Sequence, residues 1–282
     1  MTYEPIHVGP PPVYCPIAPA VHPRMFKDVF NQSIDPGATF EPSGLQFTTS
    51  AIPRHVGVIL DGNRRWAQKN DAAISDSYRR GAEKVAQLLA WCDQTRIESV
   101  TLWALSIDNM RRSPQDVGEL ADIIVKGLRK LAEARRWRLK PIGALRLLPP
   151  HVAAALHDIA ETTKAINGTL VNIAIAYDGR DEIISAVREL IQEGTRMGLS
   201  PDEIASRLLS QENIEKRLFT HDQPPVDLLI RTSGEQRLSG FLLWQAAYAE
   251  LYFCDTLWPD FEEADFCQAL RAFGQRQRRF GV

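Results

Sequence analysis

The fold class of this chain is decided by residues 55–65, HVGVILDGNRR. An uninterrupted apolar run bounded by polar residues is typical of a buried strand in a parallel sheet. Asp61 therefore comes just past the carboxyl end of a strand, where open α/β sheets bind their ligands. Gly62 allows the backbone to approach a ligand closely, and the amides that open the following helix offer an anion site. An acid, a glycine turn and two arginines suit a metal-bound diphosphate, although Asp-Gly is also an ordinary turn.

Three further apolar runs, at residues 100–105, 170–176 and 227–230, end in polar loops of the same kind. In a parallel sheet all four strand ends fall on one edge. For any single one of these polar residues, the better explanation is a helix cap or a solvated surface charge. That explanation does not account well for polar loops at the ends of all four strands. We therefore expect one edge to gather Asp61, Arg65, Ser106, Asn109, Arg112, Arg231, Arg237 and Ser239.

Two of these segments resemble the main motifs of the cis-prenyltransferases, the undecaprenyl diphosphate synthase family. They are HVGVILDGNRRWA at residues 55–67 and DLLIRTSGEQRLSGFLLWQAAYAELYF at 227–253. The similarity covers about residues 54–282, including LWPDF at 257–261 and RRFG at 278–281. It implies an α/β fold: a single domain with a mostly parallel central sheet, flanked by helices that enclose a hydrophobic tunnel.

The resemblance also implies roles for single residues. Asp61 matches the carboxylate at the allylic diphosphate and its Mg²⁺, and Glu250 matches a second acidic ligand of that ion. Ser106 and Asn109 match the loop that orients substrate and helps to remove a proton from isopentenyl diphosphate. Trp66 is expected to pack below the first loop. The candidate catalytic residues are therefore Asp61, Asn109 and Ser106. The candidate substrate-binding residues are Gly62, Asn63, Arg64, Arg65, Trp66, Tyr78, Met110 and Arg112, together with Arg231, Arg237 and Ser239 at the isopentenyl diphosphate.

The chain also departs from the usual family pattern. Residues 106–110 read SIDNM where Ser-Thr-Glu-Asn-Trp is usual, so that the flexible Met110 replaces a stacking aromatic residue. Tyr78 stands where His is common, an expected Arg is missing from residues 72–74, and Ala176 replaces Asn. These changes favour a short-chain or specialised product over a housekeeping undecaprenyl role.

We therefore interpret the chain as a Mg²⁺-dependent cis-prenyltransferase that condenses isopentenyl diphosphate with an allylic diphosphate to a short Z-isoprenyl diphosphate. Ionisation of an allylic diphosphate requires a divalent cation, several donors and a dry cavity, and the chain has no Asp-Asp-x-x-Asp motif of the trans enzymes. One alternative is a same-fold enzyme that makes an irregular, branched or cyclised terpenoid. Another is a non-catalytic partner subunit, although such subunits typically lose the Asp and the Arg-rich motif.

The composition agrees with one catalytic domain at residues 54–282. The chain has 282 residues, of which 44% are hydrophobic, enough for a sizeable core. Its net charge of −2 predicts no affinity for nucleic acid. The four cysteines have no paired spacing and fit a reducing cytoplasm. No apolar run has the length of a membrane span, and no signal peptide is recognised.

Residues 1–53 differ from the rest, since they hold ten of the eighteen prolines and show no helical or strand period. We expect a flexible or surface-wrapping arm, with Leu45, Phe47 and Ile52 able to dock onto the body. We also expect a homodimer that pairs through the apolar residues 241–244, with residues 279–281 approaching the partner's active site.

Apolar residues at helical spacing predict helices from Tyr78 to Gln94 and from Asp116 to Ala134. Such stripes usually pack a core, and by the resemblance they also form the wall of the tunnel. Further helices are expected near residues 181–195, 201–209 and 265–276. The bulky Trp103, Leu105, Met110 and Trp137 are expected to crowd the wall or floor of the tunnel, which would favour products of about C10 to C20 by steric exclusion.

Overall fold

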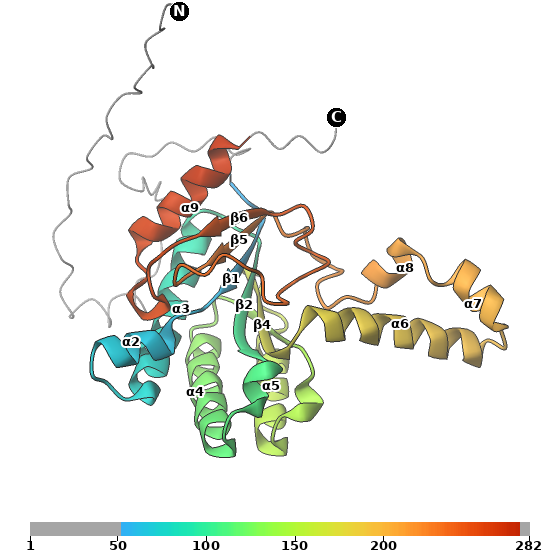
Figure 1. Cartoon of the computed structure of the whole chain (residues 1–282), viewed down its shortest axis with the longest axis horizontal. Coiled ribbons are helices and arrows are strands. Elements are labelled where there is room, and N and C mark those ends of the chain that lie inside the picture. Colours follow the sequence, from blue (N-terminus) through green and yellow to red (C-terminus); the bar gives the residue numbers. More distant parts are fainter. Residues whose placement is uncertain (1–51, 277–282) are drawn as a thin grey trace, which may run out of the picture. The chain divides into compact units, whose positions relative to one another are not determined.

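The computed structural model describes residues 52–276, which are built around one six-stranded sheet (Figure 1). The strand order is β3-β4-β2-β1-β5-β6, and every neighbouring pair is parallel. The strands are β1 (His55–Ile59), β2 (Ser99–Ser106), β3 (Arg138–Ile142), β4 (Leu170–Tyr177), β5 (Leu228–Arg231) and β6 (Glu250–Phe253). The predicted α/β class and parallel sheet are confirmed.

The four strands predicted from apolar runs are β1, β2, β4 and β5, which occupy the middle of the sheet. Every residue of β1 is buried, as expected for a strand covered on both faces. The two strands that were not predicted, β3 and β6, lie at the edges. Strand β3 contains Arg138, Lys140 and Pro141, and such residues are tolerated at a sheet edge but give no apolar run.

Helices follow most of the strands, as in other parallel α/β proteins. They are α2 (Asn63–Lys69), α3 (Ile74–Gln94), α4 (Pro114–Glu133), α5 (Pro150–Thr163), α6 (Gly179–Arg196), α7 (Pro201–Arg207), α8 (Gln211–Glu215) and α9 (Glu263–Gln275), with short 3₁₀ turns η3 (Asp108–Arg111), η4 (Leu145–Leu147) and η5 (Trp258–Asp260). Helices α5 and α8 were not predicted, whereas each of the five ranges expected to be helical contains a helix. None of the described helices is long and apolar enough to cross a membrane.

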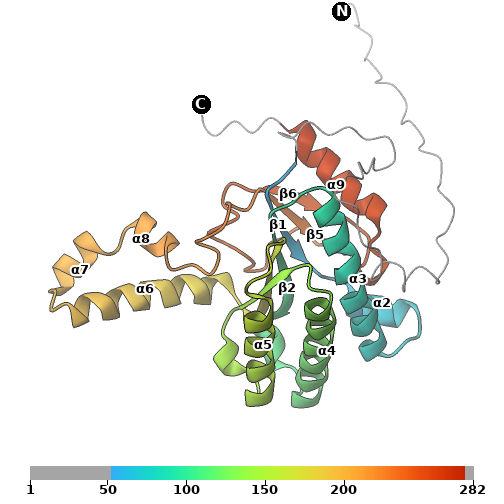
Figure 2. The ribbon, with the colours of Figure 1, turned by 180° about the vertical axis from the view of Figure 1, so that it is seen from behind.

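The two faces of the sheet are covered differently. The larger core joins one face to side chains of α3, α4, α5 and α9, and Ile52 packs against it. The smaller core joins the other face to irregular chain between α8 and β6, including Phe241 and Leu242. Helix α6 contacts both α7 and α8, and the three helices project from the sheet (Figures 1 and 2).

This arrangement corrects one prediction. Phe241 and Leu242 are fully buried within the single chain, so they do not form the apolar dimer surface that their sequence suggested. A short segment between two strands can be core or interface with the same composition, and only its placement decides. The rest of the N-terminal arm, including Leu45 and Phe47, and residues 279–281 lie outside the described residues.

The register of the sheet brings the loops after the central strands together. Ile59 of β1 pairs with Trp103 of β2 on one side and with Arg231 of β5 on the other. The loops that follow β1, β2 and β5 therefore leave the sheet at nearly the same level. Parallel strands place their carboxyl ends on one edge, and this edge is where ligands bind in open α/β sheets.

Candidate active site

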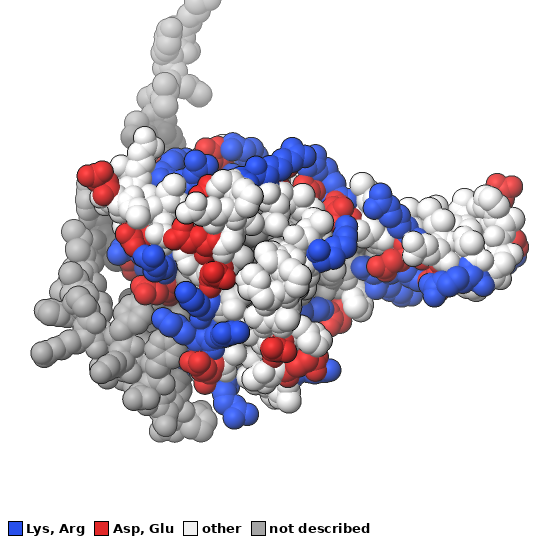
Figure 3. All heavy atoms as spheres, turned by 90° about the horizontal axis from the view of Figure 1, so that it is seen from below, with Lys and Arg blue, Asp and Glu red and all other residues white. Residues whose placement is uncertain are grey.

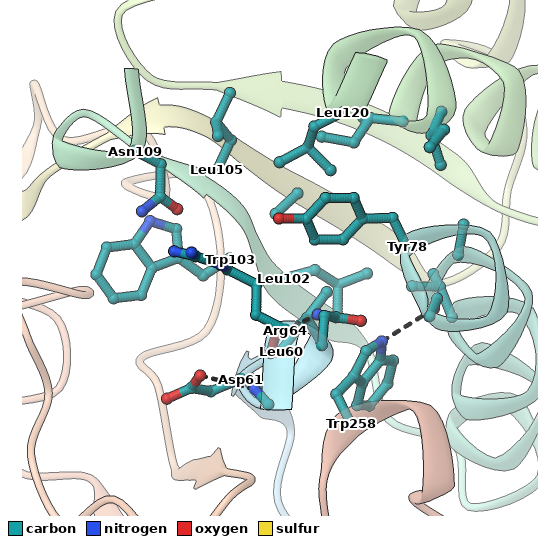
Figure 4. A pocket seen from close by; sticks show the side chains of 18 of the residues that line it. Leu60, Asp61, Arg64, Tyr78, Leu102, Trp103, Leu105, Asn109, Leu120 and Trp258 are labelled. Atoms are coloured by element: carbon teal, nitrogen blue, oxygen red, sulfur yellow. Dashed lines mark hydrogen bonds between the residues drawn. The ribbon is translucent and has the colours of Figure 1, made fainter. Parts of the chain in front are cut away.

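A cavity of about 860 Å³ opens at the carboxyl edge of the sheet. One end of it is polar, and its lining comes from the ends of β1, β2 and β5 and the loops after them. Figure 4 shows Asp61 and Arg64 from the first of these loops and Asn109 from the second. The polar lining residues are Asp61, Asn63, Arg64, Arg65, Gln68, Ser106, Asn109, Arg112, Arg231 and Ser239. Gly62 also lines this end. The structure thus gathers all but one of the eight side chains expected at this edge. Arg237 does not line the cavity, but it lies in the same loop as Arg231 and Ser239.

The other end of the cavity is apolar and runs between helices α3 and α4 over the sheet. Its walls include Ala82 and Val85 of α3, several residues of α4, and residues 102–105 of β2. The residues contributed by α4 are Leu120, Ile123, Ile124, Gly127, Leu128 and Leu131. The tunnel expected between the two helices is therefore present. Leu105 lines it as predicted. Trp103 also borders the cavity, but its ring packs against the smaller core and stacks on Phe241, and Met110 and Trp137 do not line the cavity.

Asp61 is held at the polar end by its backbone as well as its side chain. Its amide donates to the Thr232 hydroxyl at 3.0 Å, and that hydroxyl donates to the Asp61 carbonyl at 2.6 Å. Gly62 follows with a φ of 108°, and a Cβ there would come within 2.9 Å of Leu257. Position 62 therefore requires glycine both for its conformation and for space.

The Asp61 carboxylate faces arginines. Its Oδ2 accepts from Nη2 of Arg231 at 2.9 Å and lies 3.5 Å from Nη2 of Arg65. Burial alone would raise the pKa of Asp61, but the hydrogen bond and charge of Arg231, helped by Ser233 and Arg65, outweigh it and hold this pKa below its usual value. Asp61 is therefore a stable anion at neutral pH.

Arg65 lies between the two main loops. Its guanidinium donates to the carbonyl and to the hydroxyl of Ser233, at 3.0 and 2.6 Å, and it lies 3.4 Å from the Glu235 carboxylate. Glu235 also pairs with Arg237. Glu235 is thus a structural partner of two arginines of the site.

Arg231 is the most buried charged group of the site, with 5% of its side chain exposed. Besides Asp61, it donates to the Ser239 hydroxyl at 2.8 Å and to the Arg237 carbonyl. Its Nε is buried and has no hydrogen-bond partner within residues 52–276. A buried cation with one free donor has capacity for a further anionic or polar ligand.

The loop after β2 supplies the third side of the polar end. Ser106 Oγ accepts the amide of Asn109 at 3.0 Å, which fixes the turn that carries Asn109 toward the cavity. Arg112 donates from Nη1 to the Tyr78 hydroxyl of α3 at 3.1 Å. Figure 3 shows positive and negative side chains interspersed over the face seen from below, so the concentration of arginines in the cavity is a local feature.

Comparison with known proteins identifies the family. A sequence model described as "Putative undecaprenyl diphosphate synthase" matches residues 59–281, most of the chain. The chain belongs to the undecaprenyl diphosphate synthase family. The prediction from the two motifs is confirmed, and the chain is a prenyltransferase.

Several relatives of this undecaprenyl diphosphate synthase family member are closely similar. The (2Z,6E)-farnesyl diphosphate synthase of Thermobifida fusca is 50% identical over 230 residues, 81% of this chain and 90% of that protein. The short-chain Z-isoprenyl diphosphate synthase of Mycobacterium leprae is 43% identical over 242 residues, 84% and 91% of the two chains. A crystal structure of lavandulyl diphosphate synthase from Lavandula x intermedia in complex with dimethylallyl diphosphate superposes with a TM-score of 0.77 at 32% identity, covering 83% of this chain and all of that one.

Within one chain the structure places Glu250 away from Asp61, and its role as a metal ligand stays a prediction. The register of β5 and β6 pairs Leu228 with Glu250 and Arg231 with Phe253. Glu250 thus lies at the amino end of β6, about 10 Å along the strand from the level of Arg231, whereas Asp61 follows the carboxyl end of β1. Glu250 forms an ion pair with Arg276 instead. Within one chain it does not lie beside Asp61.

Two residues predicted to contact substrate lie outside the cavity lining, and their role in binding stays a prediction. Trp66 does not line the cavity, because its indole donates to Asp260 at 2.8 Å and its ring lies under the Arg80 guanidinium. The expectation that it packs below the loop describes it better. Met110 packs against the larger core and does not line the cavity either. Both residues directly follow site residues in sequence, but neither lines the cavity.

The sequence interpretation also missed residues of the site. Thr232 and Ser233 hold Asp61 and Arg65 in place, and Ser233 adopts a φ of 81° to do so. The available signal was their position between Arg231 and Glu235. By contrast, Asp178 in the loop after β4 caps α6 by accepting the amide of Arg180 at 2.8 Å. For that strand end the ordinary helix-cap interpretation holds.

The polar end fits a metal ion only if the substrate supplies most of its ligands. Within residues 52–276, no group of three or more His, Cys, Asp or Glu side chains is arranged to hold an ion. Asp61 is the one carboxylate among the described lining residues. A single carboxylate beside a diphosphate site suits a hard cation that keeps phosphate oxygens and water as its other ligands.

Proposed function

We propose that this chain condenses isopentenyl diphosphate with an allylic diphosphate in the cis configuration and releases a short Z-isoprenyl diphosphate. The observation that carries the proposal is the change of one continuous cavity from an arginine-rich end to an apolar end. A prenyl diphosphate has the same division into an anionic head and a hydrocarbon tail. The name of the Thermobifida fusca relative, (2Z,6E)-farnesyl diphosphate synthase, supports this substrate class.

Two anionic groups fit the polar end. The donor's diphosphate would lie at the Gly62–Arg65 loop, where the first turn of α2 presents backbone amides. The acceptor's diphosphate would lie at Arg231, Arg237 and Ser239. Four arginines line the cavity against one carboxylate, and this excess of positive charge favours two bound diphosphates.

The bond changes are those of an allylic substitution. The C1–O bond of the donor breaks, C1 joins C4 of isopentenyl diphosphate, a proton leaves C2 of the acceptor, and diphosphate is released. The arginines stabilise the charge that develops on the departing diphosphate. Asp61 is a poor base because its pKa is held low by Arg231, so the proton passes to a phosphate oxygen while Asn109 and Ser106 orient the acceptor.

We propose Mg²⁺ as the ion of this site, with Asp61 as its protein ligand. When bound, it would neutralise charge on the leaving diphosphate as a Lewis acid. Chelation with EDTA is expected to abolish turnover and added Mg²⁺ to restore it. Binding of inorganic diphosphate, measured by calorimetry, should weaken in parallel when the metal is removed. Full turnover in excess EDTA would contradict the proposal.

We propose that the active form is a homodimer and that it works in the cytoplasm. Phe241 and Leu242 are buried within one chain, so they cannot support a dimer interface. The support that remains is the exposed apolar side chains of Ile184, Ile191 and Tyr248. The free thiols Cys92, Cys254 and Cys267 support a reducing compartment. Light scattering at micromolar concentration tests the dimer, and a fully active monomer would contradict it.

The function is tested with purified protein, Mg²⁺ and labelled isopentenyl diphosphate, offered with dimethylallyl, geranyl or farnesyl diphosphate in turn. We expect Z-configured products of about C10 to C20, because the bulky Leu105 crowds the tunnel and overpacking disfavours further elongation. Accumulation of C50 or longer products would refute the short product, and no condensation with any donor would refute the function.

A second candidate is coupling to an irregular product. The structural similarity to lavandulyl diphosphate synthase in complex with dimethylallyl diphosphate favours it. The same assay with dimethylallyl diphosphate alone separates the two functions, since only an irregular coupling would consume it without isopentenyl diphosphate.

A further inference from the structure

The boundary between the polar and apolar ends of the cavity is formed by Tyr78 and Arg112. Both residues line the cavity, and Arg112 Nη1 donates to the Tyr78 hydroxyl at 3.1 Å. The ring of Tyr78 packs against the larger core. Figure 4 shows it among Leu102, Leu105 and Leu120, with its hydroxyl directed to the side where Trp103 and Asn109 lie. The ring thus belongs to the apolar end and the hydroxyl to the polar end.

Arg112 differs from the other arginines of the cavity in how it is held. Arg65 and Arg231 are both paired with carboxylates, Arg231 with Asp61 and Arg65 with Asp61 and Glu235. Arg64 is exposed and forms no hydrogen bond or ion pair with any other described residue. Among the described lining residues, Arg112 is therefore the one arginine that is fixed by a hydrogen bond while its charge stays uncompensated.

A neutral hydrogen-bond partner is well suited to hold Arg112 without compensating its charge. A carboxylate would orient Arg112 equally well, but it would cancel the charge that attracts an anion. The tyrosine hydroxyl accepts one hydrogen bond from the guanidinium and leaves the remaining donors free. Holding the side chain in advance also reduces the entropy lost when a ligand binds.

We infer that Tyr78 is a positioning residue that holds Arg112 for the diphosphate of the allylic donor. We assign Arg112 to the donor because it lies at the boundary between the two ends of the cavity. The donor is the substrate whose diphosphate must lie where its hydrocarbon chain enters the apolar end. The acceptor's diphosphate lies at the Arg231 loop instead. This inference rests on the proposed function and adds that affinity for the donor depends on one neutral hydrogen bond.

The test is Tyr78→Phe, which removes the hydroxyl and keeps the ring. We expect the KM for geranyl diphosphate and the Kd for inorganic diphosphate to rise about tenfold. Loss of one hydrogen bond to a charged group changes a binding constant by about this factor. The KM for isopentenyl diphosphate and kcat should change by less than about twofold, because the acceptor site and the ring packing are untouched. Tyr252→Phe is the matched control, since its hydroxyl lies on β6 at 3.5 Å from Gln268 and its loss should change neither constant.

A double-mutant cycle separates positioning from a structural role. In an Arg112→Gln background, Tyr78→Phe should raise the KM for geranyl diphosphate no further, because the residue that Tyr78 positions has lost its charge. A further tenfold rise in that background would overturn the inference, as would an equal rise in the KM for both substrates or no rise at all in the single variant. If the wild-type protein condenses no donor, the proposed function fails, while the Kd for inorganic diphosphate still tests Tyr78.

Discussion

At the scale of the residue, the site depends on how charges are shared among Asp61, Arg65 and Arg231. Arg231 is almost completely buried and uses Asp61 as its counterion, while Arg65 connects Asp61 to Ser233 and Glu235. A buried charge is tolerated only when it is paired and hydrogen bonded. The same contacts that stabilise the fold therefore arrange the cations that the proposed reaction needs.

The first prediction concerns Asp61. Asp61→Asn keeps an oxygen that can accept from Arg231 but removes the charge beside the leaving diphosphate. Loss of one electrostatic contact of the transition state costs about 3–4 kcal/mol, so kcat should fall at least about a hundredfold. Circular dichroism should show an intact fold. A folded Asp61→Asn enzyme with near-normal kcat would remove Asp61 from the mechanism.

The second prediction separates two arginines that the sequence treats alike. Arg237 is 60% exposed at its side chain, so Arg237→Ala should raise the KM for isopentenyl diphosphate more than that for the donor, with little loss of stability. Arg231→Ala should affect both substrates, because it also releases Asp61. Steady-state kinetics with each substrate varied in turn measures this difference, and identical profiles for the two variants would show that the acceptor site is wrongly assigned.

At the scale of the element, the tunnel exists because α3 and α4 come together through small residues. A Cβ at Gly127 of α4 would lie 3.5 Å from the Cβ of Ala82 on α3, and both residues line the cavity. A larger residue at either position would fill the space that a prenyl chain would otherwise occupy. The separation of these two helices thus controls how much chain the protein accommodates.

The third prediction uses two glycines of the same helix. Gly127→Leu should shift the products to shorter chains, because a side chain inserted into the tunnel excludes methylene groups. Gly118→Leu is the control, since a Cβ at Gly118 meets no atom within 4 Å, and its products should be unchanged. Both variants gain helix propensity of about 0.8 kcal/mol. Chromatography of labelled products measures the chain lengths. An unchanged product distribution in folded Gly127→Leu would contradict the proposal that the approach of Gly127 to Ala82 limits product length.

At the scale of the whole molecule, a buried polar network joins three strands to the segment before β5. His55 is fully buried, with Nδ1 2.8 Å from the Pro224 carbonyl and Nε2 2.8 Å from Thr101 Oγ1. Asn172 on β4 and Gln223 continue the network. Burial disfavours the imidazolium and lowers the pKa of His55, against the weaker opposing effects of the Pro224 carbonyl and Asp227.

The fourth prediction follows from the sign of this pKa shift. Below about pH 6.5 the unfolded chain protonates His55 while the folded chain does not, so the free energy of unfolding falls as pH drops, by up to about 1.4 kcal/mol per pH unit. Above pH 6.5 the effect is absent. Urea unfolding between pH 5 and 7.5 should show a flatter dependence for His55→Gln than for the wild type. His151→Gln, at a side chain that is 74% exposed, should keep the wild-type slope, and equal slopes in all three proteins would contradict the prediction.

The sequence by itself determined the central strands, the two helices of the tunnel and the loops that form the polar end. These features depend on local patterns: β1 and β4 are predominantly apolar runs, and α3 and α4 repeat apolar residues at helical spacing. A strand's carboxyl end is also its end in sequence, so the sequence itself assigns the polar loops to one edge of a parallel sheet.

Only the tertiary structure decided which side chains meet. Glu250 lies in a motif of the family, yet the register of β6 places it at the opposite end of the sheet from Asp61. Trp66 and Phe241 both lie within two positions of a site residue in sequence, but Trp66 packs against Asp260 and Phe241 lies in the smaller core. Edge strands such as β3 carry polar residues and Pro because one side of the strand is unpaired. Register, side-chain direction and burial are properties of pairs of segments, and no single segment encodes them.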